Sequence, residues 1–271
     1  MTDDRGTAPS TPADDAPLRV ARPADGVLEL VLDRPARRNA LDGGLQAAIA
    51  KALARLDGAR CVLLRGEGPA FCAGYDLHDL DASSGGALAV SADTGVVPHE
   101  PVAARALDRC PVPIVAALHG PVLGGGLEVA LACDLRVAAD DARLGAPAAL
   151  LGLVYSHEGL ARMHAVLGAS LARDLLLTGE ALDADRAHAA GIVHRRCTGE
   201  ELRAHALDLA TAVAARSPTA QYANRAILRA LERGGGRLTD EQRSWAVDAR
   251  RMALRSPELL EGVRRFQDRV R

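Results

Sequence analysis

The spacing of apolar residues predicts a regular alternation of strands and helices in the first half of the chain. Val27–Leu32 alternates apolar residues with acidic ones, which is typical of a half-exposed strand. Three short apolar runs, Cys61–Leu64, Ile114–Leu118 and Leu135–Ala138, predict buried strands, and Leu41–Leu56 has the spacing of an amphipathic helix. Because strands that alternate with helices favour right-handed crossovers, we expect an α/β fold with a largely parallel core.

The second half of the chain has almost no strand pattern after about residue 157. Apolar positions recur there at helical spacing in six segments: residues 158–167, 169–177, 183–190, 200–215, 219–232 and 239–254. Residues 1–17 contain almost nothing to bury, so we expect a disordered tail. We therefore divide the chain into this tail, a core over residues 18–200 and a helical region over residues 201–271.

The composition fits a globular protein and argues against several classes of function. Apolar residues make up 48% of the chain and charged residues 25%, and the formal net charge is −2. A near-neutral chain with 2% aromatic residues is a poor nucleic-acid binder, and no apolar run is long enough to span a bilayer. The five cysteines are scattered, and the N-terminus lacks a signal-peptide pattern. We expect a cytoplasmic protein with reduced cysteines and no nucleic-acid or membrane partner.

The most informative segment is a run of three glycines, Gly124–Gly126, which precedes an apolar helical pattern. Glycines let a backbone approach a ligand closely, and the free amides of a helix N-terminus favour negative charge. Glu128 lies in the first turn of that helix, where a carboxylate needs a partner or has a chemical task. A second glycine turn, Ala70–Leu77, follows the apolar run Cys61–Leu64. Backbone donors from two such turns can form an oxyanion hole.

A series of short motifs between Leu18 and Arg269 resembles the crotonase (enoyl-CoA hydratase/isomerase) superfamily. The motifs, in chain order, are Arg34-Pro35, Asn39-Ala40-Leu41, Phe71–Leu77, Pro113–Gly120, Gly124–Glu128, Cys133-Asp134, Leu151-Gly152, Leu177–Glu180, Ala190–Val193 and Glu261–Phe266. Their order and spacing carry the resemblance. It implies the crotonase fold, a spiral of ββα units with a C-terminal helical trimerisation region. It also implies assembly as a homotrimer or a dimer of trimers.

The resemblance further implies chemistry on an acyl-CoA substrate, with coenzyme A as part of the substrate and no metal or other cofactor. The oxyanion hole of the family corresponds to the backbone amides of Tyr75 and Gly125, which would stabilise an enolate beside the thioester. Glu128 corresponds to the first catalytic glutamate of the hydratases. The positions expected to contact coenzyme A are Arg37, Arg38, Ala40, Ala73, Asp76, Leu77 and Phe266, the last of them in a neighbouring subunit.

One position departs from the hydratases of this family. Hydration requires a base that activates water and an acid that protonates the α-carbon, and the hydratases use two glutamates for these tasks. The second glutamate corresponds to Ala148, which cannot transfer a proton. Ordinary hydration and isomerisation are therefore both in doubt. His157 and Glu158 are the nearby candidates for a replacement acid.

The segment Leu151–Tyr155 resembles a different subgroup, the methylmalonyl-CoA decarboxylases, although Tyr75 stands where that subgroup has histidine. Loss of CO2 forms an enolate without a base, and the hydroxyl of Tyr155 could hold the departing carboxylate. We expect an acyl-CoA lyase, either a decarboxylase of a malonyl-type thioester or an atypical enoyl-CoA hydratase. The alternatives are an isomerase, another crotonase-type reaction, or a non-catalytic binding protein in which Glu128 and Tyr155 are structural.

Overall fold

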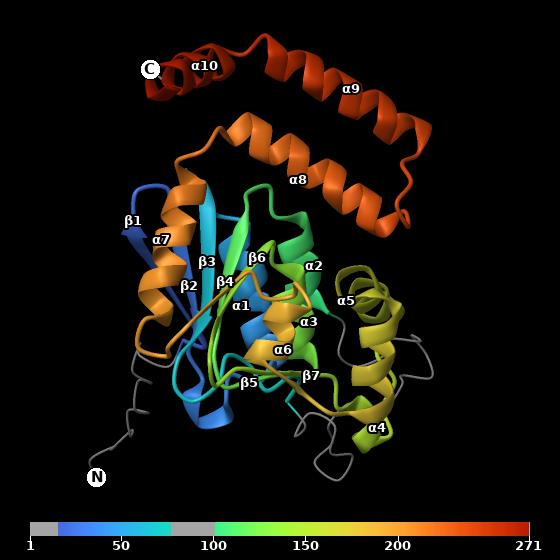
Figure 1. The fold of residues 1–271 in the computed structure, drawn as a ribbon. Helices are drawn as coiled ribbons and strands as arrows, with labels where there is room; N and C mark the ends of the chain where they lie inside the picture. The colour runs from blue at the N-terminus through green and yellow to red at the C-terminus, as the bar shows by residue number, and fades with distance from the viewer. Residues whose placement is uncertain (1–15, 77–100, 271) are drawn as a thin grey trace, which may run out of the picture.

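The computed structural model describes residues 16–76 and 101–270, and it consists of a sheet-based body with long helices stacked above it (Figure 1). The strands are β1 (Leu18–Ala24), β2 (Val27–Leu32), β3 (Cys61–Gly66), β4 (Ile114–Leu118), β5 (Pro121–Leu123), β6 (Leu135–Ala139), β7 (Arg143–Gly145), β8 (Leu182–Asp183) and β9 (Arg195–Cys197). The helices are η1 (Pro35–Arg37), α1 (Gly43–Leu53), α2 (Val102–Arg109), α3 (Gly125–Ala132), α4 (Ala148–Leu151), α5 (His157–Thr178), α6 (Ala184–Ala189), α7 (Leu202–Ala214), α8 (Pro218–Arg233), α9 (Asp240–Leu254) and α10 (Pro257–Val270).

The strands form a six-stranded sheet in the order β1-β2-β3-β4-β6-β9 and a three-stranded sheet in the order β5-β7-β8. All pairs from β2 to β9 in the larger sheet are parallel, and only β1 runs antiparallel to its neighbour. The predicted α/β fold, its parallel core and the three buried strands are therefore confirmed. The amphipathic helix is also confirmed as α1, and the Asp42 side chain caps it by accepting from the Leu45 amide. The pattern missed β8 and β9, which are too short to show periodicity.

The prediction of a half-exposed strand at β2 is wrong, because all six of its residues are buried. Glu29, in the middle of β2, is only 2% exposed and pairs with two arginines from other elements. Arg65 donates to it at 3.0 Å, and Arg203 on α7 donates to both carboxylate oxygens at 3.1 Å. Burial alone would raise the pKa of Glu29, but these hydrogen bonds hold it below its ordinary value.

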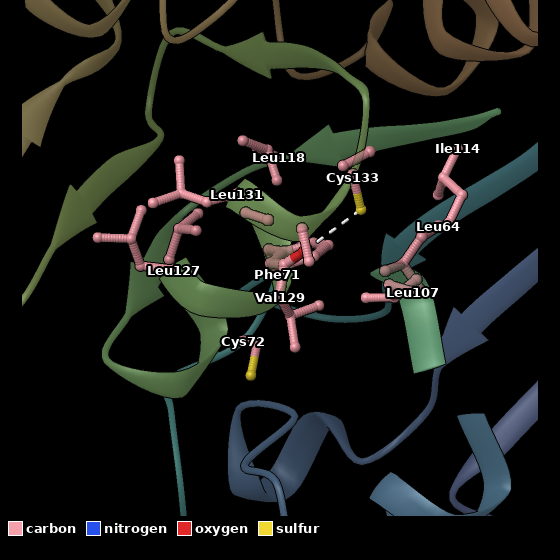
Figure 2. Close-up of a cluster of buried hydrophobic side chains, with 14 of the residues drawn as sticks. Leu64, Phe71, Cys72, Leu107, Ile114, Leu118, Leu127, Val129, Leu131 and Cys133 are labelled. Atoms are coloured by element: carbon pink, nitrogen blue, oxygen red, sulfur yellow. Dashed lines mark hydrogen bonds between the residues drawn. The ribbon is translucent and has the colours of Figure 1, made fainter. Parts of the chain in front are cut away.

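The main core lies between one face of the larger sheet and the helices α1, α2 and α3. Figure 2 shows a central part of it, where Phe71, Leu107 and Leu127 meet side chains of β3 and β4. The Cys133 thiol donates to the Val129 carbonyl at 3.3 Å, and all five cysteines are buried and free. Fully buried leucines of this kind each stabilise the fold by roughly 1.5–3 kcal/mol. A second apolar cluster lies on the opposite face of the sheet, under α7.

The C-terminal helices are joined to the body by an ion-pair cluster around Asp134. Arg225 and Arg229, both on α8, pair with the Asp134 carboxylate at 2.8 and 3.1 Å. Arg229 also reaches Asp108 on α2 at 3.2 Å. The helices α9 and α10 continue outward from α8, as the red end of the ribbon in Figure 1 shows. The body and the helical region are thus tied together by buried charge.

The predicted helical segments of the second half are all present, although two of them are merged. The segments at 158–167 and 169–177 form α5, which is interrupted at Gly168 by a non-helical backbone with φ 73° and ψ 161°. Helix α7 packs on the large sheet, so residues beyond 200 contribute to the core of the sheet. The predicted division of the chain at residue 200 stays a prediction. The predicted tail lies almost entirely outside the described residues. Within the described residues, no helix is both long enough and apolar enough to cross a membrane.

Candidate active site

The two glycine turns lie side by side because the chain after β3 runs along β5. The Phe71 amide donates to the His119 carbonyl at 2.9 Å, and the Leu123 amide donates to the Cys72 carbonyl at 3.0 Å. Gly74 then adopts φ 104°, a conformation that side-chain-bearing residues rarely adopt. A β-carbon at Gly74 would lie 2.9 Å from the Leu123 carbonyl oxygen and 3.4 Å from the Gly125 nitrogen. Only a glycine allows this approach between the two turns.

Tyr75 and Gly125, the predicted oxyanion-hole residues, are brought into contact. Gly125 is the first residue of α3, where helix geometry provides no intrahelical acceptor for the amide. The Tyr75 ring lies against it, because a β-carbon at Gly125 would be 2.8 Å from the ring atom Cε2. The Tyr75 backbone is fixed by a bridge to Leu41. The neighbouring Gly124 has φ 56° and ψ −120°, which lets the chain enter α3 at a sharp angle.

Glu128 lies in the first turn of α3 and is 2% exposed. The Tyr75 hydroxyl donates to its Oε2 atom at 3.4 Å, and a β-carbon at Gly159 on α5 would be only 2.3 Å from its Oε1 atom. Burial raises the pKa of Glu128 to about 7, against the opposing effects of the Arg162 charge and the Tyr75 hydrogen bond. A carboxyl group with this pKa can both accept and donate a proton near neutral pH.

Tyr155 lies at the same site, because a β-carbon at Gly124 would be 3.7 Å from its hydroxyl. Burial, together with the charge of Glu128, raises the phenol pKa of both Tyr155 and Tyr75. The two hydroxyls therefore stay protonated and can act as hydrogen-bond donors. Tyr155 also packs against the main core, so this placement is compatible with both predicted roles, a site residue and an ordinary core residue. Ala148, at the start of α4, is half-buried and contributes only a methyl group.

Glu158 is occupied by an ion pair and is not suited to replace the missing acid. Arg105 on α2 donates to both of its oxygens, at 2.7 and 3.0 Å. These hydrogen bonds lower the pKa of Glu158, so the carboxylate is ionised at neutral pH and is a poor proton donor. His157 is exposed at the first position of α5. Among the described carboxyl groups of this site, Glu128 is the one whose pKa lies near neutral pH.

The predicted coenzyme A contacts fall into three groups. Four of them lie on two joined loops, since the Ala73 amide donates to the Arg38 carbonyl at 3.0 Å, with Arg37 and Ala40 adjacent. Arg37 and Arg38 are exposed, whereas Ala40 is buried. Asp76 is also buried, and its carboxylate lies 3.6 Å from the Arg34 guanidinium, while its contact with coenzyme A stays a prediction.

The two remaining contacts are not placed at the site. Leu77 lies outside the described residues. Phe266 is 70% exposed on α10, which lies beyond α8 and apart from α3 in Figure 1. Phe266 therefore lies away from the glycine turns of its own chain. Its predicted contact with a neighbouring subunit stays a prediction.

Sequence reasoning missed three residues of this neighbourhood, and two of them carried no local sequence signal. Arg105 and Arg162 find their acidic partners about fifty positions away in the chain, at Glu158 and Asp108. Gly159 could have been noticed, since it sits three residues after the capping Ser156, where a larger residue is ordinarily tolerated. In the described part of the chain, no three His, Cys, Asp or Glu side chains converge as a metal site would require.

Comparison with known proteins gives matches within one family. Residues 22–269 match the family model for enoyl-CoA hydratase/isomerase. The mitochondrial enoyl-CoA hydratase domain-containing protein 2 of Homo sapiens is 33% identical, over 98% of this chain and 92% of its own. A probable enoyl-CoA hydratase of Mycobacterium tuberculosis is 37% identical, over 69% of this chain and 74% of its own.

Solved structures show the same fold. The crystal structure of the enoyl-CoA hydratase from Bacillus anthracis superposes with a TM-score of 0.81 at 25% identity, and the match covers 93% of this chain and 96% of that one. Since the family model spans nearly the whole chain and the α/β architecture is that of the solved members, the predicted crotonase fold is confirmed. The chain belongs to the enoyl-CoA hydratase/isomerase family.

Proposed function

We propose that the protein is an acyl-CoA lyase that decarboxylates a malonyl-type thioester through an enolate. The observation that carries this proposal is the carboxyl group of Glu128, with a pKa of about 7 and two phenols beside it, among described residues that offer no second such acid. Decarboxylation needs one proton donor and no base, whereas hydration needs both. Ala148 offers no second proton-transfer group, and Glu158 is held ionised by Arg105.

In the proposed reaction, the thioester oxygen accepts hydrogen bonds from the Tyr75 and Gly125 amides. The bond between the α-carbon and the carboxylate breaks, CO2 leaves, and the electron pair forms the enolate. Glu128 in its protonated form then donates its proton to the α-carbon and regains one from solvent. Tyr155 donates a hydrogen bond that orients the substrate carboxylate before it leaves. Coenzyme A takes part only as a portion of the substrate, and these steps require no metal or other cofactor.

An atypical hydration is the second candidate, and the pH dependence separates the two. Decarboxylation requires protonated Glu128, so its rate falls as the pH rises through about 7. Hydration requires Glu128 as a base, so its rate rises over the same range. General acid–base assistance contributes about 10²–10⁴-fold, and without an acid at Ala148 the hydration of crotonyl-CoA should be slower by at least that order.

Mass spectrometry of a panel of acyl-CoA thioesters tests the proposal by following loss of CO2 or gain of water. We expect loss of CO2 from a methylmalonyl-type thioester and a large reduction of that rate in Tyr155→Phe. Gly125→Pro removes one oxyanion donor, worth roughly 3 kcal/mol of barrier, and should abolish turnover. Ala148→Glu should raise hydration. Efficient hydration of crotonyl-CoA by the wild type would instead support the second candidate.

We also propose, from the family resemblance, that the protein works in the cytoplasm as a homotrimer or a dimer of trimers. The apolar side chains exposed on the C-terminal helices support the assembly, including Met252, Leu254 and Leu260 at more than 60% exposure. Such a density of large exposed apolar residues is unusual for a monomer surface.

If enolate formation does not occur with any thioester, a non-catalytic binding role becomes the better description of the protein.

A further inference from the structure

The first half of α5, residues 157–167, contacts α3 through one face and α2 through another. Towards α3 it presents Gly159, where a β-carbon would lie 2.3 Å from the Oε1 atom of Glu128. Towards α2 it presents Glu158 and Arg162, which are four positions apart and therefore lie on the same side of the helix. The half-helix that borders Glu128 is thus joined to α2 by charged side chains.

These two residues of α5 pair with two residues of α2 whose charges follow in the opposite order. Arg105 donates to both oxygens of Glu158, at 2.7 and 3.0 Å. Three positions later on α2, Asp108 accepts from Arg162. We call these four residues the α2–α5 clamp. A slip of α5 by one turn in either direction would bring like charges together, so the clamp fixes the register of the two helices.

Apolar burial holds this half of α5 only weakly. Gly159 and Met163 are its buried residues, and Met163 alone of the two has a large side chain. The second half, residues 169–178, buries Ala172 and Leu175, but Gly168 separates the halves with a non-helical backbone. Such a break lets the two halves of a helix take different positions. The clamp is therefore a main attachment of the half-helix that touches Glu128.

The two members of the clamp on α5 also act on Glu128 through their charges, in opposite directions. The Glu158 carboxylate raises the pKa of Glu128, and the Arg162 guanidinium lowers it. The phenols of Tyr75 and Tyr155 face Glu128 from the loops before α3 and α5, and burial keeps both phenols protonated. The charges beside Glu128 that can change its ionisation thus come from α5.

The members of the clamp on α2 neutralise these charges, since Arg105 pairs with Glu158 and Asp108 pairs with Arg162. We propose that Arg105 and Asp108 are positioning residues, which act on the Glu128 carboxyl group through their ion pairs with α5. The inference rests on the proposed function, in which Glu128 is the proton donor. It adds the residues that set the surroundings of this donor, and it requires neither of them to touch the substrate.

Titration of the Glu128 carboxyl carbon by NMR tests the inference without substrate. The protein carries 13C in its glutamate side chains, and the resonance is identified by its loss in Glu128→Gln. Arg105→Gln removes the cation beside Glu158, so the pKa of Glu128 should rise by about 0.5. Asp108→Asn removes the anion beside Arg162 and keeps a hydrogen-bond acceptor, so the pKa should fall by about 0.5. Loosening of α5 alone would move both variants in the same direction.

A charge exchange covers the case in which a single variant does not fold. Arg105→Glu combined with Glu158→Arg restores the ion pair and moves its cation onto α5, beside Glu128. The pKa of Glu128 should then fall by about 1 although the pair is intact. The matched control is Arg186→Gln, which breaks an ion pair with Asp174 in the second half of α5 and should leave the titration unchanged.

Several outcomes would overturn the inference. Shifts of the same sign in Arg105→Gln and Asp108→Asn would do so, as would no shift in either, or an unchanged or raised pKa after the charge exchange. Release of CO2 from acyl-CoA thioesters reports separately on the proposed function. Release of CO2 without the expected shifts keeps the lyase and removes the inference. Opposite shifts without release of CO2 from any thioester keep the control of Glu128 by α2 and remove the lyase proposal.

Discussion

The hydroxyl of Tyr75 donates to the ionisable carboxyl of Glu128 at 3.4 Å and stabilises its charged form. Tyr75→Phe removes this hydrogen bond and keeps the ring against Gly125. The pKa of Glu128 should then rise above about 7, and the falling limb of the decarboxylation rate should move to higher pH by about one unit. Rate measurements between pH 5 and pH 9 check this, with Tyr222→Phe on the exposed face of α8 as the control. An unmoved limb would show that the hydroxyl does not act on Glu128.

The raised pKa of Glu128 also has a consequence for stability. Because its pKa is about 7 in the fold and near its ordinary value of 4.5 when unfolded, the folded state binds more protons between these values. Folding stability is therefore highest below about pH 4.5 with respect to this group, and falls as the pH rises through 7. Glu128→Gln removes the penalty and should stabilise the protein by up to about 3 kcal/mol at pH 8.

The control for this substitution is the same comparison at lower pH. At pH 5 the native carboxyl is already neutral, so Glu128→Gln should change stability much less than at pH 8. Urea denaturation at both values measures the difference. If the stabilisation is equal at pH 5 and pH 8, the substitution acts through packing, and burial of the ionised Glu128 carboxylate does not destabilise the fold.

Among the elements, the contact between α3 and α5 depends on the absence of a side chain at Gly159. Gly159→Ala would place a β-carbon 2.3 Å from Glu128 Oε1, so the carboxyl group must move. Alanine otherwise favours a helix over glycine by about 1 kcal/mol, so the fold should persist while kcat falls by tenfold or more. Gly262→Ala, on α10 with nothing within 4 Å, is the matched control and should leave kcat unchanged. Full activity of Gly159→Ala would show that catalysis does not depend on the placement of the Glu128 carboxyl group.

The same elements show which parts of the structure a single sequence can predict. Strands β3, β4 and β6 and helix α1 were predictable because the local spacing of their apolar residues indicates which positions are buried. The burial of Glu29 was not, because its partner Arg203 lies 174 positions away and covers the strand with α7. The glycine turns could be located from their motifs, but the hydrogen bonds that pair them run between β5 and the loop after β3.

At the scale of the candidate site, sequence reasoning named Tyr75, Gly125, Glu128 and Tyr155, which the structure brings together. It could not choose between His157 and Glu158 as a replacement acid. That choice depended on Arg105, whose ion pair with Glu158 spans 53 positions. Residues that act through charge at a distance leave no periodic or motif signal, and only the fold reveals them.

For the whole molecule, the exposed apolar residues of α9 and α10 predict association between chains. Leu254, Leu260 and Val263 are 62%, 61% and 45% exposed. We expect light scattering at micromolar concentration to give three or six times the mass of one chain. Leu260→Asp should reduce this mass, because it buries a charge in the predicted interface. Arg251→Asp, on a polar position of α9, is the control. A wild-type monomer would contradict the prediction.

The ion pairs that fasten α8 to the body also run onward to the site. Asp134 holds Arg229, Arg229 reaches Asp108, and Asp108 holds Arg162, whose charge acts on Glu128. Helix α8, against which α9 packs, is therefore linked through ion pairs to Arg162, whose charge acts on the carboxyl group that we propose as the proton donor. If assembly changes the affinity for acyl-CoA by some factor, thermodynamic linkage requires that bound acyl-CoA changes the association constant of the subunits by the same factor. We expect acyl-CoA to shift the equilibrium between subunits and assembly. Sedimentation velocity with and without acyl-CoA measures this shift. If the ligand leaves the equilibrium unchanged, these ion pairs only hold α8 in place.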